Sequence, residues 1–241
     1  MEKIKIQNKT LEYAIVRSSR KSIGLEVSPG NGLLIRAPER VSRKRIKQVI
    51  RDKAPWILKK LEEVKEIKPE PEPLEFVTGE KIPYLGDYYN ILIKEVQGCK
   101  KPEIVLNNEY FSITINNTVE REERRQIVRD ALVSWYKKQA RLVINKRITI
   151  YQDKIGRKPV RVRIKNQKKR WGSCSSKGNL NFNWRLIMGP ISVLDYLLAH
   201  ELAHLVHPNH SKEYWKLIRS IMPEYQESKQ WLKINGNLLI I

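Results

Sequence analysis

Histidine is confined to one short stretch of this 241-residue chain: all four histidines lie between residues 200 and 210, in the segment HELAHLVHPNH. On a helix, His200 and His204 project from one face, so both rings can reach a single cation. Glu201 stands beside the first ring, where its carboxylate can take a proton from water held by that cation. The HExxH spacing therefore predicts two zinc ligands and a general base, the minimum that a zinc hydrolase needs.

A zinc site of this kind needs a third protein ligand, and the sequence offers two candidates. On a straight helix, His207 would lie about 10 Å along the axis from His200, too far to share one ion. Pro208 cannot extend the helix and Asn209 tolerates a left-handed turn, so the chain can double back. His210 is then brought to the metal at the spacing of HExxHxxGxxH proteases. We expect His210 as the third ligand, with His207 as the alternative.

Two other interpretations of the motif are a chance occurrence on a helix and a closed structural zinc site. The apolar run VLDYLLA at 193–199 indicates a buried helix, in which unpaired histidines and a glutamate would be costly. A metal removes that cost, which argues against chance. In a structural site Cys174 or His207 would complete the coordination, but Glu201 would then have no role.

The composition is that of a globular chain with a strong positive charge. Hydrophobic residues make up 41% of the sequence, and the formal net charge is +21. Because no signal-peptide block or membrane-length apolar run is visible, we expect a cytoplasmic protein, no membrane association, and free thiols at Cys99 and Cys174. The charge predicts attraction to anions, which admits nonspecific association with nucleic acid through the basic surface. Basic residues concentrate at 40–60 and at 157–170, but no nucleic-acid-binding motif is visible.

The elements that must position the motif begin with a β-rich segment at residues 1–67. It is expected to hold a small sheet followed by two helices, which start near Ser42 and Pro55. Residues 68–73, KPEPEP, alternate proline with charge and predict an extended linker. Residues 74–116 form a second β-rich segment.

The remaining segment, 117–241, is expected to form the metal-binding catalytic region. Apolar residues recur at helical spacing over 118–155, which predicts one long helix or two stacked ones beneath the metal helix. A strand over 160–165 follows, and then a tight loop, RWGSCSSKG, that leads into a short strand. Two further helices are expected on either side of Pro223. No internal repeat is evident.

Several short stretches, which together span nearly the whole chain, carry a family resemblance: residues 17–22 (RSSRKS), 35–38 (IRAP), 79–86, 170–175 (RWGSCS), 183–186 (NWRL) and 200–215. In these stretches the chain resembles the YgjP-like family of zinc metallopeptidases, which is related to the SprT-like and WLM groups. The resemblance implies an α+β fold, with a mostly β N-terminal region followed by a helical zincin-like metallopeptidase core with a small sheet. It implies His200, His204 and His210 as metal ligands and Glu201 as the base.

The site chemistry predicts a zinc-dependent hydrolase. Zinc lowers the pKa of its bound water to about 7, Glu201 takes the proton, and the hydroxide attacks a carbonyl or phosphoryl centre. Arg170, His207 and Tyr214 are candidates for contacting the substrate or steadying charge in the transition state. Each has an ordinary alternative: a packed loop for Arg170, a turn for His207 and a core aromatic for Tyr214.

Three functions follow, and the favoured one is a metallopeptidase that acts on a peptide or protein, with Zn²⁺ or another divalent metal as its cofactor. The second is a metal-dependent nucleotide pyrophosphohydrolase, since the basic residues would attract nucleoside triphosphates. The third is a non-enzymatic nucleic-acid-binding protein with a structural metal, which leaves Glu201 unexplained. No residues for any other cofactor are predicted.

Overall fold

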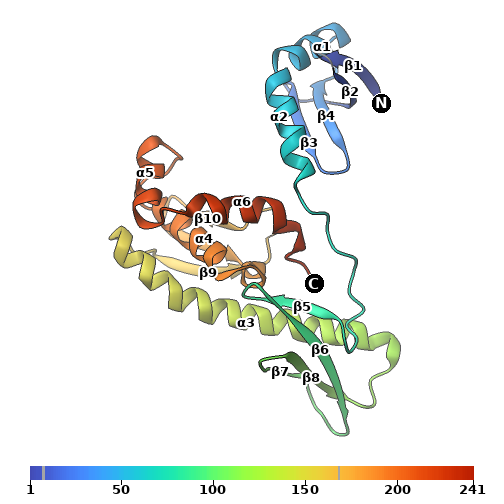
Figure 1. Cartoon of the computed structure of the whole chain (residues 1–241), viewed down its shortest axis with the longest axis vertical. Helices are drawn as coiled ribbons and strands as arrows, with labels where there is room; N and C mark the ends of the chain where they lie inside the picture. The colour runs from blue at the N-terminus through green and yellow to red at the C-terminus, as the bar shows by residue number, and fades with distance from the viewer. Residues whose placement is uncertain (7–8, 168) are drawn as a thin grey trace. The chain divides into compact units, whose positions relative to one another are not determined.

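The structure, a computed structural model, describes residues 1–6, 9–167 and 169–241. Helices occur together with three small mixed sheets, so the fold is α+β with strands at its N-terminus, which confirms the predicted fold class (Figure 1). The chain divides into two compact units, Met1–Pro69 and Glu70–Ile241, and the boundary in the sequence falls inside the proline-rich stretch 68–73. Among the described residues, no helix is long and apolar enough to cross a membrane.

The first unit contains a four-stranded sheet and two helices that share one core. In the sheet, the strands lie in the order β1-β2-β4-β3. The helices begin where the sequence predicts, because the Ser42 side chain accepts a hydrogen bond from the Arg45 amide and Pro55 lies in the first turn of the second helix. The elements are β1 (Glu2–Ile6), β2 (Lys9–Ser18), β3 (Gly24–Ser28), β4 (Gly32–Pro38), α1 (Arg43–Asp52) and α2 (Ala54–Lys65).

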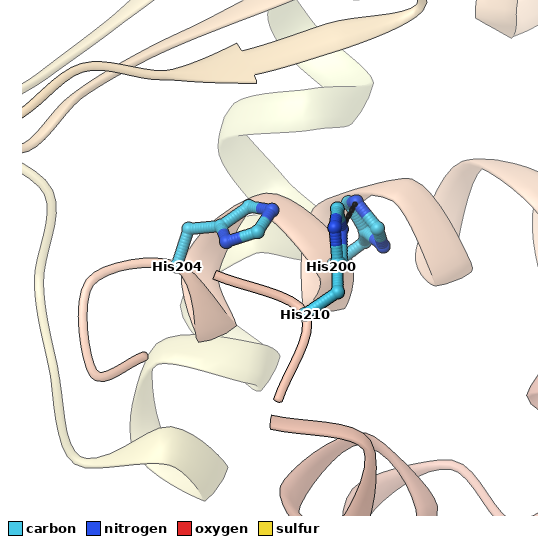
Figure 2. Close-up of side chains that lie close together, drawn as sticks. All are labelled: His200, His204 and His210. Atoms are coloured by element: carbon cyan, nitrogen blue, oxygen red, sulfur yellow. Dashed lines mark hydrogen bonds between the residues drawn. The ribbon is translucent and has the colours of Figure 1, made fainter. Parts of the chain in front are cut away.

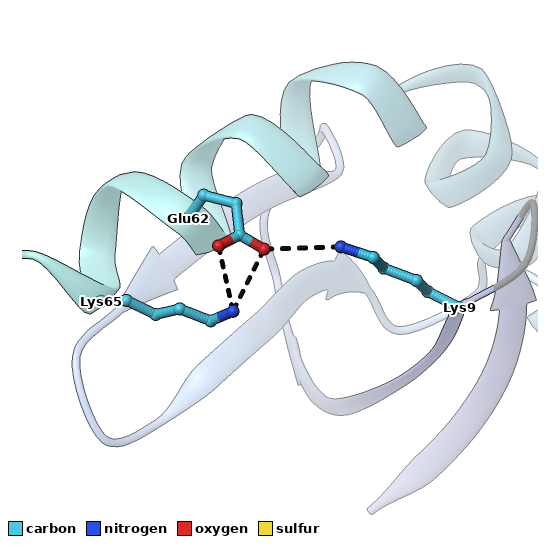
Figure 3. A network of polar contacts seen from close by, with 3 residues as sticks. All are labelled: Lys9, Glu62 and Lys65. Atoms are coloured by element: carbon cyan, nitrogen blue, oxygen red, sulfur yellow. Dashed lines mark hydrogen bonds and ion pairs between the residues drawn. The ribbon is translucent and has the colours of Figure 1, made fainter.

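A small polar network links α2 to the start of β2 on the surface of this unit (Figure 3). Glu62 accepts hydrogen bonds from Lys65, at 3.0 and 3.1 Å, and from Lys9 at 3.5 Å. The bond to Lys65 is the main cause that lowers the pKa of the Glu62 carboxyl. All three groups are exposed, so the network orients side chains and contributes little to stability.

The second unit opens with a sheet of the same size. Its strands lie in the order β5-β6-β8-β7. They are β5 (Lys81–Tyr84), β6 (Asp87–Val96), β7 (Glu103–Leu106) and β8 (Tyr110–Asn116).

The two four-stranded sheets repeat one topology, although no repeat is evident in the sequence. In both, a first hairpin is antiparallel, the second strand pairs in parallel with the fourth, and the fourth pairs antiparallel with the third. The second strands β2 and β6 have ten residues each and the same order of buried and exposed positions. Their sequences, KTLEYAIVRS and DYYNILIKEV, share almost no residues. The repeat is therefore preserved in the alternation of burial, which many sequences satisfy.

One long helix, α3 (Arg121–Ile155), spans the second unit and has 35 residues. Seven of its side chains are buried, nearly all at intervals of four residues, which makes one apolar stripe along its length. The helix ends at Gly156, whose positive φ of 70° suits a left-handed cap. Of the two alternatives that the sequence leaves open, a single helix is the one observed, and it contacts the helix that carries the histidine motif.

A third sheet and the last helices complete the unit. In the sheet, β10 pairs antiparallel with β11, and β11 pairs in parallel with β9. The stretch 170–178, which the sequence predicts as a loop, therefore contains the short strand β10. The elements are β9 (Arg161–Lys165), β10 (Gly172–Cys174), β11 (Asn179–Asn183), η1 (Trp184–Met188), α4 (Ile191–Ala203), α5 (Lys212–Ile221), α6 (Tyr225–Asn235) and η2 (Gly236–Leu238).

The basic cluster at 157–170 follows the ordinary strand pattern. Arg161, Arg163 and Lys165 are exposed along β9, while the apolar residues between them are partly buried. Val160, the first residue of the strand expected over 160–165, lies before the observed strand and is 77% exposed. Lys168 lies outside the described residues.

Candidate metal centre

The histidine motif lies on α4, a helix buried on all sides. Ten of its thirteen residues are buried, including Asp195 and Glu201. Asp195 is held by Arg147 of α3, which donates from Nε and Nη2 to its two carboxylate oxygens. This bidentate pair compensates the buried charge and fixes α4 against α3.

The chain leaves α4 several residues before Pro208, the residue that the sequence analysis excludes from the helix. The helix ends at Ala203, and His204 is its C-cap with helical angles of φ −66° and ψ −17°. The amides of Val206 and His207 both donate to the Ala203 carbonyl, at 3.0 and 2.9 Å, and close a tight turn before Pro208. The helical angles of His204 keep its ring on the same face as that of His200, so the earlier end does not separate the two rings.

The reversal brings His210 back to the helix. Ser211 caps α5, since its side chain accepts a hydrogen bond from the Tyr214 amide at 3.2 Å. One ring nitrogen from each of His200, His204 and His210 can be chosen so that all three lie within 4.8 Å of one another. Figure 2 shows the three side chains converging from the helix and from the returning segment. His207, the alternative ligand, is not part of this group.

The rings are oriented by contacts at their other nitrogens. His204 Nδ1 lies 3.1 Å from the backbone carbonyl oxygen of His207. His200 Nδ1 lies 3.5 Å from the Tyr196 hydroxyl, one helical turn away. A ring that donates from Nδ1 keeps Nε2 as an acceptor that can bind a cation. Tyr214 donates to the backbone carbonyl of His200 at 3.0 Å and is fully buried.

The donor set fits a zinc ion. Zinc–nitrogen bonds of about 2.05 Å at tetrahedral angles place two ligand nitrogens about 3.3 Å apart. The Nε2 atoms of His200 and His210 are 3.2 Å apart. Burial first, and then the neighbouring rings, lower the pKa of His200 to about 3, so its imidazole is neutral near pH 7 and available as a ligand.

Glu201 points away from solvent toward the third sheet and is 5% exposed. It lies against Gly172 of β10 so closely that a Cβ at residue 172 would be 2.5 Å from Glu201 Oε1. Burial raises the pKa of Glu201 to about 7, and the charge of Arg170 acts in the opposite direction. Arg170, a predicted substrate contact, therefore lies near enough to influence the carboxylate.

Two hollows flank the histidines. One, of about 250 Å³, has His200 in its wall together with Trp171, Tyr196 and Lys229. The other, of about 480 Å³, lies between α5 and α6 and includes Trp215 and Lys229. The Trp215 ring stacks on His210 with centroids 5.5 Å apart and planes at 18°, so the second hollow adjoins the histidine group.

Several residues around the centre were not identified from the sequence. The sequence predicts a loop at Gly172, although a glycine in the RWGSC stretch is also a signal for close approach of another segment. The sequence indicates Tyr196 only as part of an apolar run. Trp215 and Lys229 gave no local signal, because their relation to the histidines depends on how α5 and α6 pack. The two cysteines are free, as expected, and the charge of Glu201 helps to raise the pKa of the Cys174 thiol, after burial.

Comparison with known families places the chain among the metallopeptidases. The YgjP-like metallopeptidase domain matches residues 21–235, and the chain therefore belongs to the YgjP-like family. A search of curated proteins finds no match. Among solved structures, the crystal structure of the metallopeptidase zymogen of Pyrococcus abyssi abylysin is 22% identical, covers 39% of this chain and 94% of that chain, and gives a TM-score of 0.35. A likeness at that TM-score carries no argument about function.

Proposed function

We propose that the chain is a zinc-dependent metallopeptidase in which His200, His204 and His210 hold the ion and Glu201 is the general base. The convergence of the three ring nitrogens within 4.8 Å, together with the buried Glu201 that follows His200 on α4, carries this proposal. A structural zinc site would explain the histidines alone. It would not explain a carboxylate held in a niche that admits no side chain at residue 172.

A zinc ion in this position supplies a Lewis acid that makes water more acidic and polarises a carbonyl group. Glu201 takes a proton from the attacking water, whose oxygen forms a bond to the carbonyl carbon of the peptide. The carbon–nitrogen bond then breaks as Glu201 returns the proton to the departing amine. A single carboxylate thus acts first as base and then as acid, which a buried and fixed position favours.

The other predicted contacts have different surroundings. Arg170 lies near Glu201 and remains our candidate for holding a substrate oxygen. Tyr214 is buried and its hydroxyl already donates to His200, which favours a positioning role. His207 contributes its backbone carbonyl to the orientation of His204.

A matched pair of variants tests the ligand assignment. We expect His210→Ala to lower zinc affinity by about tenfold or more, while His207→Ala keeps the backbone carbonyl and binds one equivalent of zinc. Zinc content after dialysis and competition with a chromophoric chelator give both values. Loss of zinc from the His207 variant alone would reverse the assignment.

The activity test uses zinc-loaded protein, a peptide library and a panel of nucleoside triphosphates. We expect peptide cleavage that chelation abolishes, that zinc restores, and that Glu201→Gln reduces by about a hundredfold or more. Glu201→Gln keeps the size of the side chain, so zinc content and thermal stability should be retained. Undiminished cleavage by this variant would remove Glu201 from the mechanism.

A second candidate function is hydrolysis of phosphoanhydride bonds in nucleoside triphosphates. It is favoured by the hollow between α5 and α6, where Lys212, Lys216, Arg219 and Lys229 surround aromatic side chains beside His210. Basic groups can bind phosphates and an aromatic face can stack on a base. Release of phosphate or pyrophosphate, lost in Glu201→Gln, with no cleavage of any peptide, would select this function over the first.

A further inference from the structure

The hollow between α5 and α6, which we call the α5–α6 pocket, is built from one face of each helix. On α5, Trp215, Lys216 and Arg219 lie three, four and seven residues after Lys212, so all four share one helical face. Tyr225 and Lys229 stand one turn apart on α6. Four cations therefore converge on two aromatic rings in a space of about 480 Å³.

None of the four cations of the pocket forms an ion pair with a carboxylate among the described residues. Glu213 of α5 lies near enough to Lys216 for their charges to interact, but it does not line the pocket. Lys212 and Lys216 are like charges four residues apart, an arrangement that disfavours the helix until an anion offsets it.

The pocket is joined to the histidine group through its aromatic wall. Trp215 stacks on both His210 and Tyr225, with the Tyr225 centroid 5.4 Å away. Lys229 lies over the Trp215 ring at 4.4 Å and also lines the hollow beside His200. An anionic group in the pocket would therefore sit one aromatic side chain away from a proposed metal ligand.

We propose that the α5–α6 pocket is a substrate subsite that binds the carboxylate of an acidic side chain, so that the enzyme prefers peptides with aspartate or glutamate near the cleaved bond. This inference rests on the proposed peptidase function. The aliphatic part of the acidic side chain contacts Trp215, and its carboxylate is held by Lys216, Arg219 and Lys229. The size of the pocket admits one side chain rather than a folded domain.

The test compares peptides that differ only by glutamate or glutamine, with the exchange scanned along both sides of the cleaved bond. At one position we expect the glutamate peptide to have a kcat/KM about fivefold to tenfold higher, since each partly exposed charge contributes up to about fivefold. Lys216→Ala/Arg219→Ala should abolish this preference, so that the glutamate and glutamine peptides have the same kcat/KM.

A matched control removes two charges elsewhere. Lys137 and Arg141 are exposed and four residues apart on α3, and neither lines the pocket. Lys137→Ala/Arg141→Ala should keep the preference, which separates a subsite from a general effect of net charge. A preference that persists in Lys216→Ala/Arg219→Ala, or no preference at any position, overturns the proposal.

Calorimetry on the zinc-loaded Glu201→Gln protein separates failure of the subsite from failure of the function. In one outcome the unsubstituted protein cleaves no peptide, but the glutamate peptide binds about fivefold tighter than the glutamine peptide, and the pocket substitutions remove this difference. The subsite then stands and the peptidase mechanism fails. Equal binding of the two peptides overturns the subsite. In a further outcome, inorganic triphosphate binds in a way that depends on Lys216 and Arg219, and the two peptides bind equally. The pocket is then assigned to phosphate binding instead.

Discussion

Gly172→Ala is the most direct test of how the base is held. The added Cβ would lie 2.5 Å from Oε1, 2.8 Å from Cγ and 2.9 Å from Cδ of Glu201. Cβ atoms essentially never approach a neighbour below 3.0 Å, so Oε1 alone must move by at least the difference between 2.5 Å and 3.0 Å. Because all three contacts belong to one side chain, the carboxylate moves as a group.

The size of this displacement sets the expected loss. A misplacement of about 1 Å at a reacting group can cost about a hundredfold in rate, so we expect kcat to fall by about tenfold to a hundredfold. Overpacking should lower the free energy of unfolding by about 1–3 kcal/mol. Zinc affinity should be unchanged, because none of the three histidines is among the closest neighbours of the new methyl group.

The assay is single-substrate kinetics on zinc-loaded protein, with zinc content and thermal unfolding measured on the same samples. Gly189→Ala is the control, since its Cβ would press on Trp231 at 3.2 Å, away from Glu201. It should lose some stability and keep kcat within about twofold. In the Glu201→Gln background, Gly172→Ala should cost little further activity, because both changes act on one group. A Gly172→Ala protein with native stability and full kcat would refute the proposal that Gly172 positions the Glu201 carboxylate.

Two predictions concern the elements that support the site. Asp195→Asn should lower the free energy of unfolding by about 2 kcal/mol, because it leaves Arg147 without its charged partner in a pair that is partly exposed. Thermal unfolding should show the loss, and Asp130→Asn, in a surface pair, should cost about 0.5 kcal/mol or less. Tyr214→Phe removes the hydrogen bond to the His200 carbonyl and should cost about 1 kcal/mol of stability. Its kcat should stay within about threefold, and a hundredfold fall would instead make the hydroxyl a substrate contact.

Local sequence patterns are sufficient to predict the helices and the convergence of the three histidines. The spacing of His200 and His204 fixes their common face, and Pro208 with Asn209 predicts the reversal that returns His210. The helix α4 ends several residues before Pro208, since the turn is closed by hydrogen bonds to the Ala203 carbonyl. These hydrogen bonds satisfy the end of the helix before Pro208 is reached, so the proline does not determine where α4 ends.

Contacts between distant segments could not be read from the sequence. β10 lies against α4, with Gly172 and Glu201 in contact although they are far apart in the chain. The duplicated sheet topology was missed for a related reason, because strand pairing depends on alternation and register, which leave residue identities free. The family resemblance, which the match over residues 21–235 confirms, covered both regions without revealing either feature.

The ligands and the base of the proposed site depend on different parts of the structure. Residues 200–210 bring the three histidines together within one helix end and one turn. Glu201 belongs to the same helix, yet its carboxylate is placed by β10, which the pairing with β11 holds in the third sheet. Zinc binding and catalysis should therefore be separable: changes in β10 act on kcat, and changes in the turn act on zinc affinity. This separation follows from the placement of the carboxylate on the sheet side of α4, and a site that only bound metal would not require it.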